Sequence, residues 1–340
     1  MMELLPQEYR SPQLYGDFWF NSDPIPIYAL QGYIILIDFW DYTCQACLRA
    51  LPYVQEWHRR YNDKGLVTIG VHTPEFPFAR DPIRVRKAIE RLGVHYPVVM
   101  DNDFIIWNAY RTSVWPTKYL IDKNGFIRYI HAGEGSYQNF EHAMQALLHE
   151  AGYHAEFPLI MDPVRDTDRP GAICYRVTPE ILTGWHRGTL GNVEGYSPES
   201  TIHYEDPSFY IPGRLYLHGN WLNDRNSVRL NETDGKEGYL LITYQAKEVN
   251  AVIKPEGEKN FQVFAQQDDR YLTLENQGDD ILTDEEGRSY FLVRDAKLYN
   301  IVKNKEFGEY KLKLSTRANG FTLYSISFVS CVIPEMSIHS

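Results

Sequence analysis

The chain has few cysteines, which excludes one class of protein at once. Only four occur among its 340 residues, at positions 44, 47, 174 and 331. Small secreted proteins that depend on disulfides carry cysteine far more densely, so no general disulfide framework is expected. Cys44 and Cys47 are separated by only two residues, and this spacing needs an explanation of its own.

The chain also lacks an excess of positive charge. Its 34 lysines and arginines are outnumbered by 45 aspartates and glutamates, which gives a formal net charge of −11. Proteins that bind nucleic acid carry a basic surface that neutralises phosphates, and neither half of this sequence has one. Nucleic acid is therefore excluded as a partner, and the acidity is interpreted as an aid to solubility.

Long apolar runs are absent as well. No stretch of about 18 apolar residues occurs, so no membrane-spanning helix is predicted. The first eight residues, MMELLPQE, lack the basic and apolar segments of a signal peptide. From the chain as written we therefore expect a cytoplasmic protein.

The first part of the chain shows alternating strand and helix patterns. A chain of this length is long enough for two domains. Strands are predicted at residues 33–40, 66–71, 97–100, 117–121 and 126–130, and helices at 44–61, 82–92, 104–110 and 137–151. This order predicts an α/β domain over residues 1–152, with a mixed sheet and helices on both of its faces.

The pattern changes after residue 152. Pro158, Pro163 and Pro170 interrupt it, and we predict a linker over residues 153–175. Short, often alternating segments follow at 214–217, 228–230, 239–244, 249–253, 261–265, 290–293, 310–314 and 321–329. Clusters of Gly, Asn and Asp separate these segments, which predicts a jelly-roll-like, all-β sandwich over residues 176–340.

The Cys44-Gln45-Ala46-Cys47 motif lies between a buried strand and a helix, a position typical of dithiol–disulfide chemistry. A free thiol has a pKa of about 8.5, which falls to roughly 3.5–7.5 at helix N-termini in such motifs. We assign Cys44 as the nucleophile and Cys47 as the resolving thiol. The alternatives are a pair of metal ligands or two inert thiols, but a zinc site needs a second ligand pair and none is visible.

Two further residues are candidates for the same site. Asp38, in the buried strand, could take the proton from Cys47, because a desolvated carboxylate has a raised pKa. It could equally be a polar residue at a strand end. Trp115-Pro116 precedes another strand, where a cis proline would offer backbone hydrogen bonds to an extended substrate and a trans proline would only make a turn.

These motifs together resemble the thioredoxin superfamily. The match rests on Asp38-Phe39-Trp40, Cys44-Gln45-Ala46-Cys47, Pro52 and Trp115-Pro116-Thr117, in that order and spacing. The chain is most similar to the soluble C-terminal part of DipZ-like proteins, relatives of the TlpA-like thiol–disulfide reductases. Further similar stretches are Trp19–Ser22, Gly70–Phe76, Leu92–Pro97, Asp101–Asp103, Trp107–Tyr110, Lys118–Asp122, Gly133–Gly135, Thr178–Glu180, Gly219–Trp221 and Arg288–Val302.

The resemblance implies a fold, an activity and a set of site residues. It implies a thioredoxin-like domain, a cis Pro116, and a β-sandwich likened to carbohydrate-binding modules. It implies catalysis by the Cys44–Cys47 disulfide without another cofactor or a metal. We also assign Trp40, Thr43, Trp115 and Glu75 to substrate binding.

The same resemblance implies partners and a compartment. The family transfers electrons from a membrane partner to extracytoplasmic protein disulfides, so the expected partners are disulfide-containing or dithiol proteins. This chain has no transmembrane relay domain, and a separate electron donor or acceptor, such as a membrane thiol transporter, is therefore expected. The implied compartment is extracytoplasmic, in conflict with the expectation from the N-terminus.

Two other functions remain open. One is a thiol peroxidase, although its reactive cysteine usually follows a Thr by three residues and here Thr43 is adjacent to Cys44. The other is a module that binds glycan or protein, with Trp185 and Trp221 as a platform for sugar stacking. Cys174 and Cys331 could pair across the sandwich, but buried free thiols are expected instead.

Overall fold

The computed structural model describes residues 4–154, 156–169, 172–232, 235–257 and 260–332. They form two compact units, Met1–Asp168 and Arg169–Ser340, so the division falls inside the predicted linker. Pro170, one of the predicted linker prolines, lies outside the described residues. Within the described ranges, none of the helices is long and apolar enough to cross a membrane.

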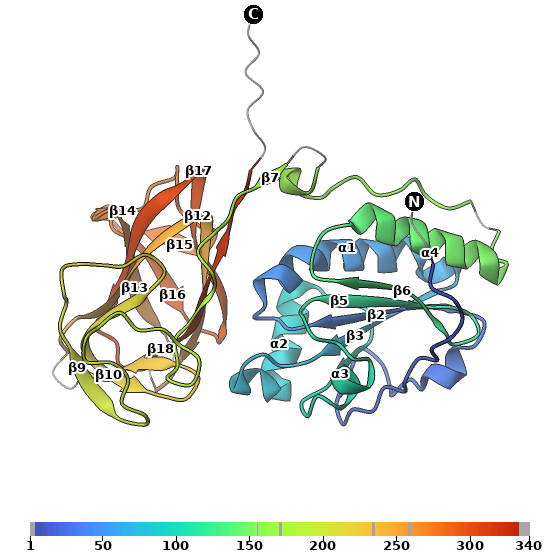
Figure 1. The fold of residues 1–340 in the computed structure, drawn as a ribbon, viewed down its shortest axis with the longest axis horizontal. Coiled ribbons are helices and arrows are strands. Elements are labelled where there is room, and N and C mark those ends of the chain that lie inside the picture. The colour runs from blue at the N-terminus through green and yellow to red at the C-terminus, as the bar shows by residue number, and fades with distance from the viewer. Residues whose placement is uncertain (1–3, 155, 170–171, 233–234, 258–259, 333–340) are drawn as a thin grey trace, which may run out of the picture. The chain divides into compact units, whose positions relative to one another are not determined.

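Among its described residues, the first unit contains one mixed sheet and four α-helices. Figure 1 shows how they are arranged within the unit. Its strands are β1 (Trp19–Phe20), β2 (Ile34–Trp40), β3 (Leu66–His72), β4 (Val98–Met100), β5 (Thr117–Ile121) and β6 (Ile127–Ala132). Its helices are α1 (Gln45–Tyr61), α2 (Pro82–Leu92), α3 (Ile105–Ala109) and α4 (Tyr137–Ala151), with 3-10 turns η1 (Ile27–Leu30), η2 (Asn62–Lys64), η3 (Pro77–Arg80) and η4 (Asp166–Asp168). The predicted α/β fold is confirmed, and the short strand β1 is an addition to it.

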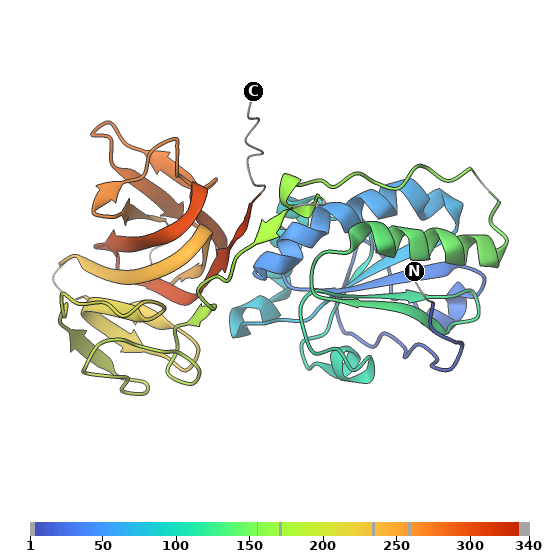
Figure 2. The same cartoon turned by 45° about the horizontal axis from the view of Figure 1, so that its top comes forward.

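Strand β2 lies at the centre of this sheet. The strand order is β1-β4-β3-β2-β5-β6, in which β2 runs parallel to β3 and antiparallel to β5. All seven residues of β2 are buried, as its continuous apolar sequence predicts for a strand covered on both faces. Helices α1 and α4 lie side by side over one face of the sheet, and α3 lies on the other (Figures 1 and 2). The active-site segment leaves the C-terminal end of β2 and enters α1, so it is anchored to the most buried strand of the unit.

Part of the predicted linker belongs to the first unit. The backbone N–H of Met161 donates to Glu141 of α4 at 2.8 Å, and Gln145 donates to the carbonyl of Pro158 at 2.9 Å. The Tyr53 hydroxyl of α1 donates to Asp168 at 2.6 Å. Side chains of α1 and α4 thus hydrogen-bond to Pro158, Met161 and Asp168 of the predicted linker. No local sequence pattern predicts these contacts.

The second unit is an antiparallel β domain with eleven strands in its main sheet. Those strands are β8 (Ile181–Leu182), β9 (Thr201–Tyr204), β10 (Leu215–Asn223), β11 (Val228–Leu230), β12 (Gly238–Pro255), β13 (Phe261–Gln267), β14 (Arg270–Tyr271), β15 (Ile281–Thr283), β16 (Ser289–Val293), β17 (Lys297–Thr316) and β18 (Phe321–Val329). A separate pair is formed by β7 (Ile173–Cys174) and β19 (Cys331–Val332). The prediction of an all-β second domain is confirmed.

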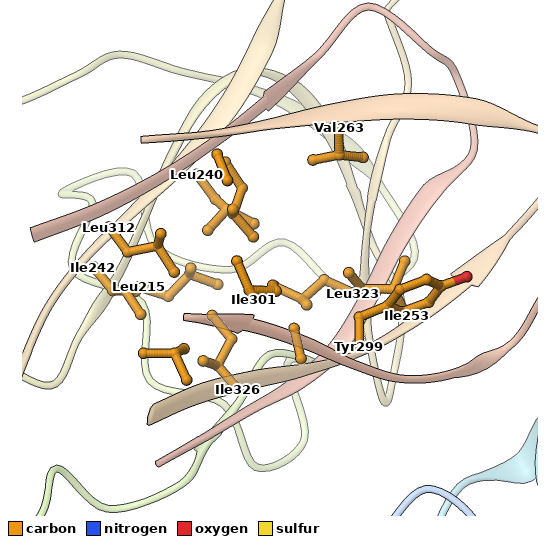
Figure 3. Packing of buried hydrophobic residues seen from close by; sticks show 14 of the residues in the cluster. Leu215, Leu240, Ile242, Ile253, Val263, Tyr299, Ile301, Leu312, Leu323 and Ile326 are labelled. Carbon is orange, nitrogen blue, oxygen red and sulfur yellow. The ribbon is translucent and has the colours of Figure 1, made fainter. Parts of the chain in front are cut away.

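Two strands of this unit are much longer than predicted. β12 joins the predicted strands 239–244 and 249–253 into one, and β17 extends the predicted 310–314 strand back to Lys297. β12 pairs with β10 along its first part and with β18 along its second, so the sheet folds around its core. Leu240, Ile242 and Ile301 are fully buried in that core (Figure 3). The prediction of two separate strands here is wrong, because β12 stays paired with β17 on both sides of its largely polar segment 245–248.

The expectation of buried free thiols in this unit is wrong for Cys174. Cys174 is exposed and disulfide-bonded. The antiparallel register of β7 and β19 places Cys331 directly opposite Cys174. Facing residues of an antiparallel pair have Cα atoms about 4.5–5.5 Å apart, which is within the range of a disulfide.

Candidate active site

Cys44 is the N-cap residue of α1. Its φ and ψ of −79° and 116° are extended, and its Sγ accepts a hydrogen bond from the backbone N–H of Cys47 at 3.2 Å. Both cysteines are free thiols. Cys44 is 8% exposed and Cys47 is 2% exposed, so an approaching substrate disulfide meets Cys44 before Cys47. The structure thus gives the two thiols the different environments that the assignment of nucleophile and resolving thiol requires.

The environment of Cys47 keeps its proton in place. Burial raises the pKa of the Cys47 thiol well above its ordinary 9.0, and the hydrogen bond and charge of Cys44 and the charge of Asp38 act in the same direction. The backbone of Asp41 opposes this shift without cancelling it. Cys47 therefore needs a proton acceptor before it can attack.

This shift predicts a pH dependence of stability for the reduced protein. A thiol whose pKa is higher in the folded than in the unfolded state stabilises the fold below the unfolded value, and this contribution is lost as the pH rises. We expect the free energy of unfolding of the reduced protein to fall above pH 9.0, the ordinary value, by at most about 1.4 kcal/mol per pH unit from this one group. Urea unfolding at a series of pH values measures it. The oxidised protein and the reduced Cys47→Ala variant lack the thiol and are expected to lack this component; an equal fall in all three would contradict it.

Asp38 lies near Cys47 and takes part in a buried ion pair. It is 3% exposed, and its Oδ1 is 3.4 Å from Nζ of Lys118, which is 1% exposed. Burial raises the pKa of Asp38, while the charge and hydrogen bonding of Lys118 counteract part of that increase. Asp38 is thus close enough to Cys47 to influence its ionisation and has a cation that favours its charged form.

Tyr96 is a third buried ionisable residue near Asp38 and Cys47. Burial raises the pKa of the Tyr96 hydroxyl, with further contributions from the charges of Asp38 and Cys47. Its ring lies over Gly70, where an added Cβ would come within 3.1 Å of the ring. Gly70 pairs with Asp38 in the β2–β3 register, so the missing side chain leaves room for the tyrosine beside the carboxylate.

Pro116 is preceded by a cis peptide bond. Its neighbour Thr117 pairs with Phe39 near the end of β2, which places Pro116 at the same end of the sheet as the cysteine motif. The Pro116 carbonyl accepts a hydrogen bond from the backbone N–H of Gly133 at 2.7 Å. Trp115 Nε1 donates to the carbonyl of Thr73 at 3.1 Å. The cis geometry and position implied by the resemblance are therefore both observed.

Asp41 organises the loop between β2 and α1. It is fully buried, and its Oδ1 accepts from the backbone N–H and the hydroxyl of Thr43 at 2.7 and 2.8 Å. Its Oδ2 accepts from the backbone N–H of Glu75 at 2.6 Å, and the ring of buried His72 lies 3.9 Å from Oδ1. Sequence reasoning missed Asp41, although an acidic residue between a buried tryptophan and the cysteine motif was a visible signal.

We expect Asp41→Asn to destabilise the protein by about 2–3 kcal/mol, because an amide cannot accept all three bonds and places NH2 against a buried donor. Urea unfolding of the reduced protein measures this change. Asp81→Asn is the matched control, since Asp81 accepts the same i+2 backbone bond, from Ile83, at an exposed helix N-cap where Asn serves equally well. Equal stability of the Asp41→Asn variant and the wild type would refute the structural role of Asp41.

Two assignments to substrate binding are corrected. Trp40 and Thr43 are each 1% exposed, so neither can touch a bound protein. Trp40 packs edge-on against His72, and the Thr43 hydroxyl is used by Asp41. Trp115 is half-buried next to Pro116, and Glu75 is half-buried next to the cysteine loop, so both remain candidates.

The second unit does not form the aromatic platform considered from the sequence. Trp221 is fully buried in the core, where it contacts Phe321 at a centroid distance of 6.0 Å. Trp185 is half-buried, with Arg225 over its ring and its Nε1 donating to Glu199. The burial of Trp221 excludes it from stacking on a sugar.

Each of the two units contains a segment that matches a known protein family. Residues 20–130 match the AhpC/TSA family, and residues 178–328 match a family described as thioredoxin like C-terminal domain. Together these matches cover the described cysteine site and most of the β domain.

Individual relatives extend this comparison. Protein DipZ of Mycobacterium bovis is 34% identical over 238 residues, which are 69% of this chain and 33% of that protein. The thiol-disulfide oxidoreductase ResA of Geobacillus kaustophilus is 30% identical over 117 residues, 34% of this chain and 64% of that protein. A solved thioredoxin-like protein in its oxidised form is 27% identical with a TM-score of 0.40, covering 43% of this chain and 99% of its own. The chain spans about a third of the length of the DipZ proteins that it matches.

Proposed function

Because residues 20–130 match the AhpC/TSA family and residues 178–328 match a family described as thioredoxin like C-terminal domain, we propose that this chain exchanges thiols and disulfides with protein substrates through Cys44 and Cys47. One observation carries the proposal. The Cys44 sulfur, at the N-terminus of α1, accepts a hydrogen bond from the backbone N–H of Cys47. The thiol of Cys47 is more deeply buried, and the charge of Asp38 acts on it.

The first step is attack by Cys44 on a substrate disulfide. The Cys47 N–H and the N-terminus of α1 stabilise negative charge on the Cys44 sulfur, as helix N-termini do. Attack forms a bond between Cys44 Sγ and one substrate sulfur and breaks the substrate S–S bond, and the second substrate sulfur leaves as a thiolate. Pro116 lies at the same end of the sheet, and the backbone next to it would pair with the extended chain that flanks the disulfide.

The second step is attack by Cys47 on the mixed disulfide. Asp38 takes the Cys47 proton, and the resulting thiolate attacks Cys44 Sγ, forming the Cys44–Cys47 disulfide and releasing the substrate thiolate. The raised pKa of Cys47 keeps this thiol protonated until Asp38 is available. The substrate disulfide has then gained two electrons and is released as a dithiol, and the Cys44–Cys47 pair is oxidised to a disulfide. The same two steps run in reverse would oxidise a substrate dithiol.

The turnover cycle needs an electron donor or acceptor outside the chain. Each turnover converts the Cys44–Cys47 dithiol into a disulfide or the reverse, so another dithiol or disulfide must restore it before the next turnover. We therefore propose a separate partner dithiol, such as a membrane thiol transporter, and an extracytoplasmic site of action. Glu75 and Trp115, which flank the cysteine loop and Pro116, are proposed to contact the bound protein.

A thiol peroxidase is the competing enzyme. The Thr43 hydroxyl is committed to Asp41 and lies one residue before Cys44, which supports thiol–disulfide exchange over peroxide reduction. Rapid consumption of hydrogen peroxide by the reduced protein, with insulin left unreduced, would reverse this preference.

Trapping of substrates tests the proposal. In a Cys47→Ser variant the mixed disulfide at Cys44 cannot be resolved, so proteins captured in the source cell are expected to be released by reductant and to carry cysteines known to pair. The Cys44→Ser variant is the control and is expected to capture none. Equal capture by both variants would refute the assignment of Cys44 as nucleophile.

A further inference from the structure

A row of three ionisable side chains crosses the sheet from the dithiol toward the edge strand. Asp38 of β2 pairs with Lys118 of β5, and Lys118 pairs with His131 of β6. Directly opposed residues on adjacent antiparallel strands have Cβ atoms about 4.5–5.5 Å apart and lie on the same face of the sheet. The three side chains are therefore neighbours across the sheet, although they are far apart in the sequence.

The row lies on the face covered by α1 and α4. Asp38 raises the pKa of Cys47, which belongs to α1. Tyr129, two residues before His131 and thus on the same face of β6, contacts Phe140 of α4 at a centroid distance of 5.6 Å. Figures 1 and 2 show both helices over this face of the sheet. The strand order makes β6 an edge strand.

Of the three side chains in the row, only that of His131, on the edge strand, reaches solvent. Asp38 and Lys118 are 3% and 1% exposed, whereas His131 is half-buried. Asp38 Oδ1 and Lys118 Nζ lie 3.4 Å apart, and within the described part of the chain neither atom hydrogen-bonds to any other group. A buried ion pair held by so few other contacts adds little net stability over apolar residues of the same size, so stability alone does not account for it.

The charged and titratable neighbours of the row are few. Asp38 is faced by Lys118 from β5, by Cys47 from α1 and by Tyr96 from the segment before β4. Burial lowers the pKa of His131, and the charge of Lys118 lowers it further, against a hydrogen bond to the Glu134 carbonyl. His131 is therefore neutral at neutral pH. Its Nε2 lies 3.3 Å from that carbonyl oxygen, which can only accept, so Nε2 carries the proton and Nδ1 is the acceptor.

We propose that Lys118 and His131 form the route by which the proton taken from Cys47 leaves Asp38. The inference rests on the function proposed above. When Asp38 has accepted the Cys47 proton, it passes a proton to Lys118 as Lys118 gives one to Nδ1 of His131. Asp38 returns to the carboxylate, Lys118 remains an ammonium, and the imidazolium of His131 releases one proton to solvent. Lys118 and His131 act through Asp38, so they are positioning residues.

The two steps can be timed separately with dithiobis(nitrobenzoate). Attack by Cys44 on this disulfide releases one thionitrobenzoate, and resolution by Cys47 releases the second, so absorbance rises in two phases. In His131→Ala we expect the first phase to be unchanged and the second to slow about tenfold, less than the roughly 100-fold that losing a general base itself costs. Imidazole added to the buffer is expected to restore the second phase, because the site of His131 is reachable from solvent.

Matched variants separate this role from a structural one. His142→Ala removes an exposed histidine from α4 and is expected to leave both phases unchanged. Lys118→Met is expected to slow the second phase and alter its pH profile; if it does not fold, His131→Ala decides alone. A second phase in His131→Ala with the wild-type rate and pH profile, or one that imidazole does not restore, overturns the inference while leaving the proposed function intact. A wild-type protein that shows no first phase overturns both.

Discussion

Cys44→Ser is expected to lower the rate of disulfide reduction by at least about 1,000-fold, because removing an attacking nucleophile costs catalysis on that scale or more. Cys44 is the more exposed thiol of the pair, and its sulfur accepts the Cys47 N–H. A serine hydroxyl at the same helix N-terminus is not ionised near neutral pH and does not exchange with disulfides. Insulin reduction with dithiothreitol as electron donor measures the loss.

Cys47→Ser provides the comparison that this prediction needs. It keeps the nucleophile, so one round of attack is expected to proceed and to stop at the mixed disulfide. Loss of turnover in both variants, with an adduct only in Cys47→Ser, distinguishes chemistry from misfolding. Retention of a tenth of wild-type turnover by Cys44→Ser would contradict the account.

Asp38→Asn is expected to slow the resolving step by about 100-fold at neutral pH, the lower end of what a general base contributes. The side chain keeps its shape but can no longer take the proton of Cys47. Because burial raises the pKa of Asp38 above its ordinary 3.8, the wild-type step should accelerate as the pH rises through that raised value, and the variant should lose this rise. The second phase of the dithiobis(nitrobenzoate) reaction, recorded from acid to neutral pH, measures both effects.

The control for Asp38 must address Lys118, which is left as a buried, unpaired cation in the single variant. Breaking such a pair from one side costs about 3–5 kcal/mol, whereas replacing both partners is often neutral. The double variant Asp38→Asn, Lys118→Met is therefore expected to regain stability and to keep the slow resolving step. Asp63→Asn removes the carboxylate of an exposed ion pair with Lys64 and is expected to change neither property. A double variant with a wild-type resolving rate would show that Asp38 is no proton acceptor.

Local sequence signals account for most of the first unit. The unbroken apolar run from Ile34 to Ile37 predicts a strand buried on both faces, and β2 is one. The predicted helix at 82–92 is α2, and the residues on either side of it, Asp81 and Gly93, cap it, with Gly93 at a φ of 66°. These features depend on residues close together in the chain, which is why the pattern alone identifies them.

The site itself was only partly predictable. Cys44, Cys47, Asp38 and Pro116 belong to a sequence motif, and the structure gathers them at one end of the sheet. Lys118 left a signal, a lone cation in the buried strand β5, but its partner depends on the β2–β5 register. No local pattern encodes that register or the contact of Lys118 with Asp38.

The second unit shows the same limit on a larger scale. The alternating segment Tyr310–Leu314 predicts a strand, but not that it continues back to Lys297 as β17. That continuation depends on pairing with β12 over most of its length. The bonding of Cys174 likewise depends on strands at opposite ends of the unit.

The central claim is that Cys44 attacks first and Cys47 resolves, and peptide mapping of a trapped adduct tests it most directly. Reduced Cys47→Ser and Cys44→Ser variants are mixed with one equivalent of a disulfide-bonded peptide, quenched with acid, and digested for mass spectrometry. We predict the peptide on Cys44 in the first variant and at most a trace on Cys47 in the second. Equal labelling of Cys47, or no adduct on Cys44, would contradict the account.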